Sequence, residues 1–282
     1  MLEDNDKLNV QMKIQQYDRV RYENNPLAEV ICQVRFPYES SLADSLPDKL
    51  STDLHALGYT QRSEEQVFSI SIAIPPIPAS STDSVRAPTG KIFHLSEESG
   101  IFKVSICSDY LALSCAKYLS WDDFKPKFIQ AYDVLRKLVP DITPLRLGLR
   151  YKDVIVRESI GLEGVQWHEL ISPFLLGPLG LHAFNDDDLD IEESVPTSVM
   201  QSTIRLEDCE LLLQSALLRS ADGDKTAFLI DSDFYVENSS PEVMNDDTQL
   251  HLTLTKLHHS AGSLFRRGIT EKLHAALSPK QI

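Results

Sequence analysis

Short runs in which apolar and polar residues alternate, separated by turns, are the feature that most constrains what this chain folds into. After Pro26, for example, Val30, Cys32, Val34 and Phe36 alternate with more polar neighbours, which is typical of a strand with one buried face. Two intervening turns, EESG and ADGD, are typical of β-hairpins. The pattern therefore predicts antiparallel strands, and it recurs at residues 66–74, 91–96, 101–107, 110–116, 144–155, 197–206, 210–218 and 225–236.

Other segments repeat their apolar residues at the spacing of three and four that marks an amphipathic helix. One such series ends at Gly58, a second follows a Ser120 N-cap, and a third closes the chain. A further short helix is expected within residues 165–180, broken by Pro173 and Gly177. The three main stripes are Leu42, Leu46, Leu50, Leu54 and Leu57; Phe124, Phe128, Tyr132, Leu135 and Leu138; and Leu250, Leu254, Leu257, Ala261 and Leu264.

The order of these elements predicts an α+β fold of two similar halves. In each half a helix is followed by an antiparallel meander and then by a long helix that packs on the sheet. We expect an N-terminal arm over residues 1–18, a first half over 19–158 and a second half over 159–282. Since no residue-level repeat joins the halves, the order alone points to an internal duplication.

Acidic residues number 42 against 27 basic ones, which gives a formal net charge of −15. Such a balance argues against sequence-independent binding to nucleic acid. The acid is concentrated in residues 185–193, whose spacing lacks the glycine and glutamate of a calcium-binding EF-hand loop. This segment is either a solvated connector or an interaction surface, and its candidate partner-binding residues are Asp186, Asp187, Asp188, Asp190, Glu192 and Glu193.

Several features indicate a cytoplasmic protein that does not enter a membrane. No apolar run reaches the length of about 20 residues that spans a bilayer. The first residues are acidic and polar, unlike a signal peptide. The four cysteines form no CxxC pair and are expected to be buried free thiols.

Two arginines on one strand are the strongest candidates for binding an anion. Arg146 and Arg150 project from the same face, about 7 Å apart, with only Gly148 between them. Together with Arg35 and Tyr151 they would suit a carboxylate or phosphate. Arg205, in the sequence STIRLED, would converge with them if the strands are neighbours. The alternative is that each arginine pairs with a nearby acid of the chain and only ties strands together.

Motifs for catalysis and metal binding are absent from the sequence. It contains no GxSxG elbow, no phosphate-binding GxxxxGK[ST] loop, no GxGxxG and no HExxH. His251 and His258 share a helix face, but their spacing of seven is not that of a metal site. We therefore expect no enzyme, no cofactor and no bound metal.

Four phrases occur together in order: YENNPLAEVICQVRF, DYLALSCAKYLSWDDF, LRLGLRYKDVI and LHHSAGSLFRRGITEKLHAALSP. In this combination the chain resembles an uncharacterised, sporadically distributed bacterial family of about this length. The resemblance implies no catalytic residue, because that family has no settled activity. Its patchy distribution implies mobile gene neighbourhoods such as phage defence or toxin–antitoxin modules.

Two functions follow as hypotheses. The first is a non-catalytic interaction protein, the partner or neutralising component of such a module, whose acidic surface binds a basic protein. The second is a sensor with an arginine-lined pocket for an anionic small molecule. The apolar stripe of the last helix fits either the core or a homodimer interface.

Overall fold

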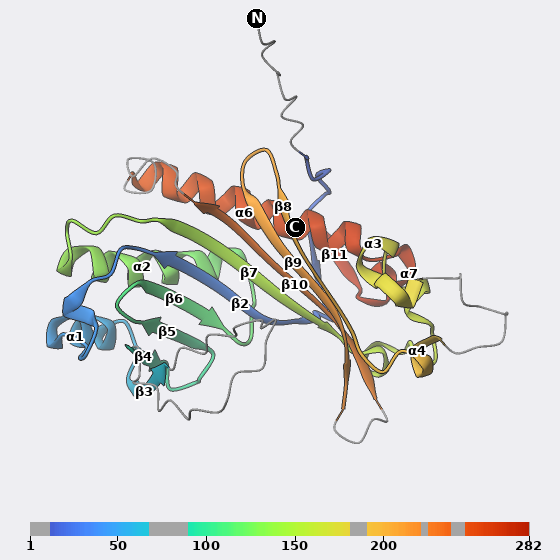
Figure 1. Ribbon diagram of the computed structural model, residues 1–282, viewed down its shortest axis with the longest axis horizontal. Helices are drawn as coiled ribbons and strands as arrows, with labels where there is room; N and C mark the ends of the chain where they lie inside the picture. The colour runs from blue at the N-terminus through green and yellow to red at the C-terminus, as the bar shows by residue number, and fades with distance from the viewer. Residues whose placement is uncertain (1–11, 68–89, 181–190, 221–224, 238–245, 282) are drawn as a thin grey trace, which may run out of the picture. The chain divides into compact units, whose positions relative to one another are not determined.

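The computed structural model describes residues 12–67, 90–180, 191–220, 225–237 and 246–281. Helices and antiparallel strands are both present (Figure 1), which confirms the predicted α+β class. Among the described helices, none combines the length and apolar character that a membrane span requires.

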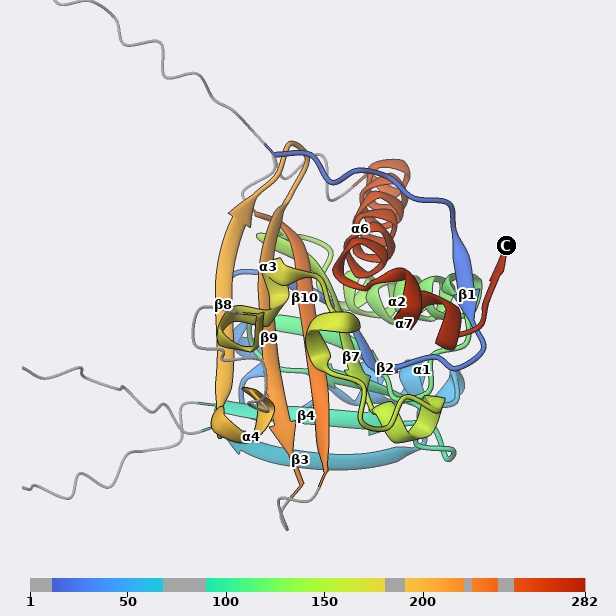
Figure 2. The same ribbon diagram turned by 90° about the vertical axis from the view of Figure 1, so that its right-hand side faces the viewer.

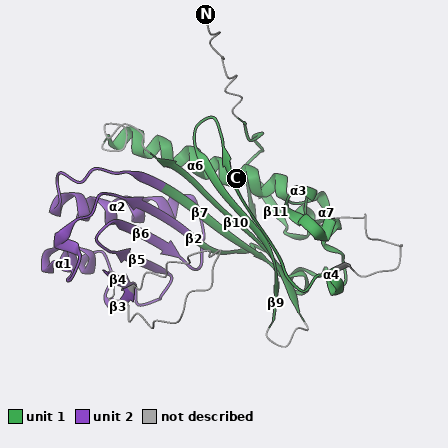
Figure 3. Ribbon diagram, in the orientation of Figure 1, with its two compact units in different colours: residues 1–30, 148–239, 246–282 green, residues 31–147, 240–245 purple. Residues whose placement is uncertain are grey.

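Two compact units divide the chain (Figure 3), and they are not consecutive halves. The first unit comprises residues 1–30, 148–239 and 246–282, and the second comprises 31–147 and 240–245. The expected boundary at residue 158 does not coincide with this division. The chain changes units instead within two strands, β2 (Leu27–Arg35) and β7 (Arg146–Ile155).

The second unit holds an antiparallel meander and two helices. Its strands follow the order β3-β4-β5-β6-β2. The long helix α2 begins where expected, because the Asp123 amide donates to Ser120 Oγ at 3.2 Å, and it buries Phe124, Phe128 and Tyr132. The elements of this unit, besides its part of β2, are α1 (Asp48–Ala56), β3 (Gln61–Val67), β4 (Gly90–Ser96), β5 (Phe102–Ile106), β6 (Tyr110–Cys115) and α2 (Trp121–Leu138).

Two boundaries in this unit differ from the prediction. The helix expected from the leucine series begins only after Pro47, whose extended backbone (ψ 137°) precedes α1, and Leu42 lies in a separate 3-10 turn, Ser40–Leu42. Strand β3 begins at Gln61, five residues before the expected run, and residues 68–74 lie outside the described ranges. Its residues are exposed on both faces as far as Gln66, so no alternation marks this strand.

The strands of the first unit follow the order β7-β10-β9-β8. Figure 2 shows α6 on one side of these strands, where its leucine stripe is buried and contacts β10. On that face β10 buries Phe228, Ile230 and Phe234. The elements, besides β7, are α3 (Pro173–Leu176), α4 (Ile191–Ser194), β8 (Ser198–Arg205), β9 (Glu210–Arg219), β10 (Thr226–Glu237), α6 (Asp247–Gly268) and α7 (Glu271–Ala276), with 3-10 turns at Arg157–Ile160, Trp167–Glu169 and Gly177–Gly180.

The two chain ends pair with each other in the first unit. Strand β1 (Val20–Tyr22) lies antiparallel to β11 (Pro279–Gln281), with Arg21 opposite Lys280. Both strands are three residues long, too short for a periodic pattern to reveal. The predicted arm of residues 1–18 therefore leads directly into a strand that is held by the other end of the chain.

Candidate functional site

Arg150 does not face an open anion site. Its Nε donates to Asp231 Oδ1 at 2.7 Å and its Nη2 to Oδ2 at 2.5 Å. The Asp231 side chain is only 7% exposed, and this bond raises the pKa of Arg150. This ion pair fits the alternative in which an arginine only ties strands together, since it joins β7 to β10. Its partner, however, is not an acid that lies nearby in the sequence.

The other candidate arginines each have a different environment. Arg35 pairs with Asp109 at 2.9 Å in the second unit, and Arg205 lies 3.6 Å from Glu210 on the surface of the first. Arg146 is half-buried at the start of β7. Since Arg35 and Arg150 already bind carboxylates, an arginine-lined pocket loses two of its expected donors.

Tyr151 belongs to a chain of polar contacts that runs from its buried ring to an exposed arginine. Its hydroxyl lies 2.7 Å from His258 Nδ1, while Arg19 donates to His258 Nε2 at 3.1 Å. Because arginine only donates, Nε2 is the acceptor and the proton of the neutral ring is on Nδ1. This chain links β7, α6 and the segment that precedes β1.

Asp153, on the same face of β7 as Tyr151, is the most unusual titratable group of the first unit. It is 6% exposed, and burial together with the charge of Asp231 raises its pKa to about 8. Among the described residues, no group donates a hydrogen bond that would stabilise its ionised form. The carboxyl group is therefore mainly protonated at neutral pH.

A small polar cavity lies beside the paired chain ends. The Tyr22 hydroxyl lies 2.9 Å from His274 Nδ1, and burial raises the pKa of Tyr22 to about 12. Burial and the charge of Arg266 lower the pKa of His274. The cavity has a volume of about 220 Å³ and is lined by Tyr17, Asp18, Val20, Arg266, His274 and Gln281. Sequence analysis did not find it, because its walls come from opposite ends of the chain.

The predicted acidic surface is corrected at Glu192. Its side chain is 11% exposed and is gripped by Arg157, whose Nη2 donates to Oε1 at 2.8 Å and whose Nη1 donates to Oε2 at 2.9 Å. Glu193, the next residue, is exposed. Asp186, Asp187, Asp188 and Asp190 lie outside the described residues. Glu192 is thus an anchor for the segment rather than part of its exposed charge.

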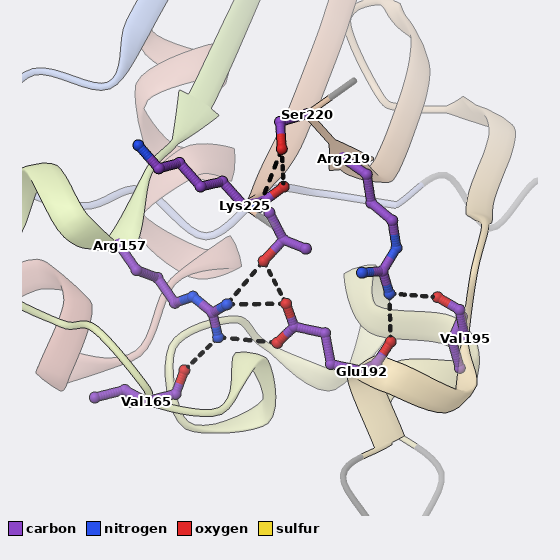
Figure 4. A network of polar contacts seen from close by, with 8 residues as sticks. Arg157, Val165, Glu192, Val195, Arg219, Ser220 and Lys225 are labelled. Atoms are coloured by element: carbon purple, nitrogen blue, oxygen red, sulfur yellow. Dashed lines mark hydrogen bonds and ion pairs between the residues drawn. The ribbon is translucent and has the colours of Figure 1, made fainter. Parts of the chain in front are cut away.

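Figure 4 shows how this anchor is built from distant parts of the first unit. Arg157 also donates to the Val165 carbonyl and to Thr226 Oγ1, each at 2.7 Å, and its guanidinium lies 4.4 Å from the centre of the Trp167 ring. Arg219 donates to the backbone carbonyls of Glu192 and Val195. The network therefore fixes α4 and the start of β8 against the sheet.

In the described part of the chain, potential metal ligands do not cluster and the cysteines are free thiols. No three His, Cys, Asp or Glu side chains there are placed to hold a metal ion. Three of the cysteines are buried and Cys209 is half-buried, all as free thiols, and burial raises the pKa of the Cys107 thiol to about 12. Raised thiol pKa values are those of structural rather than reactive cysteines.

Comparison with known proteins adds no identification. No family model matches the chain, and no curated protein matches it significantly.

Proposed function

We propose that this protein is a non-catalytic interaction protein that binds a basic protein partner through its uncompensated negative charge. The observation that carries the proposal is that arginines of this chain are already paired with its own carboxylates. Two of the arginines expected to bind an anion, Arg35 and Arg150, and the buried Arg157 are each bound to a carboxylate of the chain. These neutral pairs leave the excess of 15 negative charges to act on the surroundings.

Glu193 and the preceding acids Asp186, Asp187, Asp188 and Asp190 are the proposed contact residues. The support for this choice is the anchor at Glu192, which attaches one end of the acidic segment to the sheet. An anchored segment loses less conformational entropy on binding than a free one. We place the protein in the cytoplasm as a component of a bacterial defence or toxin–antitoxin module.

The test is the association rate with the partner at low and high salt. Neutralising the four aspartates to asparagine should slow association at low salt by about tenfold or more, and added salt should abolish the difference. Neutralising four exposed acids elsewhere in the chain, Glu98, Asp141, Glu158 and Glu163, removes the same charge and is the matched control. A rate that depends neither on salt nor on the aspartates would refute the proposal.

A second candidate function, a small-molecule sensor, is favoured by the cavity beside the chain ends. Arg266 and His274 line this cavity and are the groups that could contact an anion, although Arg266 also pairs with Glu271. Thermal stabilisation by phosphate or nucleotides that is lost in Arg266→Gln would support this function. If phosphate and nucleotides leave the melting temperature unchanged, the cavity has no such role.

We also propose that the two units arose by duplication. In the second unit β4-β5-β6-β2 has the same order as β8-β9-β10-β7 in the first, so that the last strand of each meander lies beside the strand that opens the repeat. A long helix follows each meander, α2 in one unit and α6 in the other. An experimental structure in which the two sets of strands superpose with their helices on the same face would support duplication, and opposite faces would contradict it.

A further inference from the structure

Strand β8 is the outermost strand of the first unit. It pairs with β9 from Ser198 opposite Leu217 to Arg205 opposite Glu210. Figure 2 shows it at the margin of the sheet, and within the described residues no strand pairs with its other side. The bridge between Met12 and Leu206 lies just beyond its C-terminal end. Among the described residues, its outer row of backbone N–H and C=O groups therefore has no strand partner.

The sequence of β8 lacks the usual protection of an edge strand. Ser198–Ile204 contains seven residues without a charge or a proline. Strand β3, at the margin of the second unit, instead carries Arg62, Glu64 and Glu65 within seven residues. Charged residues on edges prevent pairing with other chains. Although 24% of the chain is charged, this stretch of the edge strand carries no charge, and a strand that pairs with another chain requires such an edge.

Side chains on both faces of β8 offer apolar contacts to an added strand. On one face Val199 is 58% exposed, and its partner on β9 is Ala216. Leu218, two residues beyond Ala216 on the same face, is 37% exposed. On the other face Met200 and Ile204 are half-buried. Alternate residues of an added strand would thus meet apolar neighbours, which is how strand addition achieves specificity.

Charge decides which occupant fits this edge. A second copy would bring another net charge of −15 to the interface, whereas a basic protein is attracted to the same surface. We propose that β8 receives an extended segment of a basic protein by strand addition, with uncharged, β-branched residues in the paired part. This inference rests on the proposed function and specifies how the partner is recognised.

A synthetic peptide of alternating valine and threonine between lysine-rich ends is the probe. Two further peptides carry N-methyl groups on alternate amides, one for each edge of the peptide strand, and keep the charge unchanged. We expect one N-methylated peptide to bind at least about tenfold more weakly than the unmodified peptide, because it loses several hydrogen bonds of about 1 kcal/mol each. The other should retain its affinity.

Hydrogen exchange locates the binding. The peptide should slow amide exchange in β8 and leave β3, the charged edge, unchanged. Equal binding by all three peptides, or protection outside β8, would overturn strand addition while leaving the electrostatic proposal standing. If a peptide with glutamine in place of lysine binds equally well, the choice of a basic partner is wrong, and with it the proposed function. Protection of β8 that rises with protein concentration in the absence of peptide would assign the edge to a second copy instead.

Discussion

Buried ionisable groups are the residues whose placement has the largest consequences in the first unit. Asp153 is kept mainly protonated by its surroundings, whereas Glu192 accepts two hydrogen bonds from the Arg157 guanidinium. The strand pattern predicts which face Asp153 occupies, as it does for the buried Leu147 and Leu149. What that face packs against depends on residues far away in sequence, so the same pattern does not predict the raised pKa.

Replacing Asp153 by asparagine should stabilise the protein, and the gain should grow with pH. The pKa of about 8 in the folded protein lies above 3.8, the ordinary value for an aspartate, so the unfolded chain ionises first as the pH rises. The free energy of unfolding of the natural protein should therefore fall between about pH 4 and about pH 8. The variant lacks this dependence and should be more stable by a few kcal/mol, roughly, at neutral pH. Thermal unfolding across this range checks it, with exposed Glu193→Gln as the control; an equal gain at all pH values would contradict the explanation.

Replacing only one residue of the Arg157–Glu192 pair should lower the free energy of unfolding more than replacing both residues. Arg157→Met alone leaves the buried carboxylate of Glu192 without its main partner, which typically costs about 3 to 5 kcal/mol. Replacing both residues, as Arg157→Met with Glu192→Leu, should recover a large part of that loss. Urea unfolding of both single variants and the double variant gives the coupling energy. Additive losses would show that the pair is not the stabilising unit.

At the scale of elements, local signals proved the most predictable. The N-cap of α2 and the stripes of α2 and α6 are confirmed, because both depend on residues within a few positions of each other. The short strands β1 and β11 were missed, since their pairing joins Val20 to Gln281. Helix α7 was also missed: Thr270, which accepts from the Leu273 amide at 3.4 Å, was a readable N-cap signal.

Two glycines of α6 allow a matched test of how this helix packs. A Cβ on Gly262 would meet no atom within 4 Å, whereas one on Gly268 would lie 2.7 Å from Leu175 Cδ1. Gly262→Ala should raise stability by about 0.5 to 1 kcal/mol through helix propensity. Gly268→Ala should lose that gain or reverse it, because the buried Leu175 side chain of α3 must move. Equal melting temperatures for the two variants would contradict the packing of α6 against α3.

At the scale of the whole molecule, the arrangement of strands was the least predictable level. The helices and most strands follow from sequence, but the division between units falls inside β2 and β7, where the alternation continues without a break. The acidic excess needs no structure to be seen. A structure is needed, however, to tell which carboxylates remain uncompensated, as the burial of Glu192 and Asp231 shows.

Native mass spectrometry of the untagged protein from its own cells, at low and high ionic strength, tests the central claim most directly. We predict a complex with a basic protein at low salt that dissociates as the salt concentration rises. A protein partner that remains bound at high salt would contradict the account. So would a retained small molecule without any protein partner.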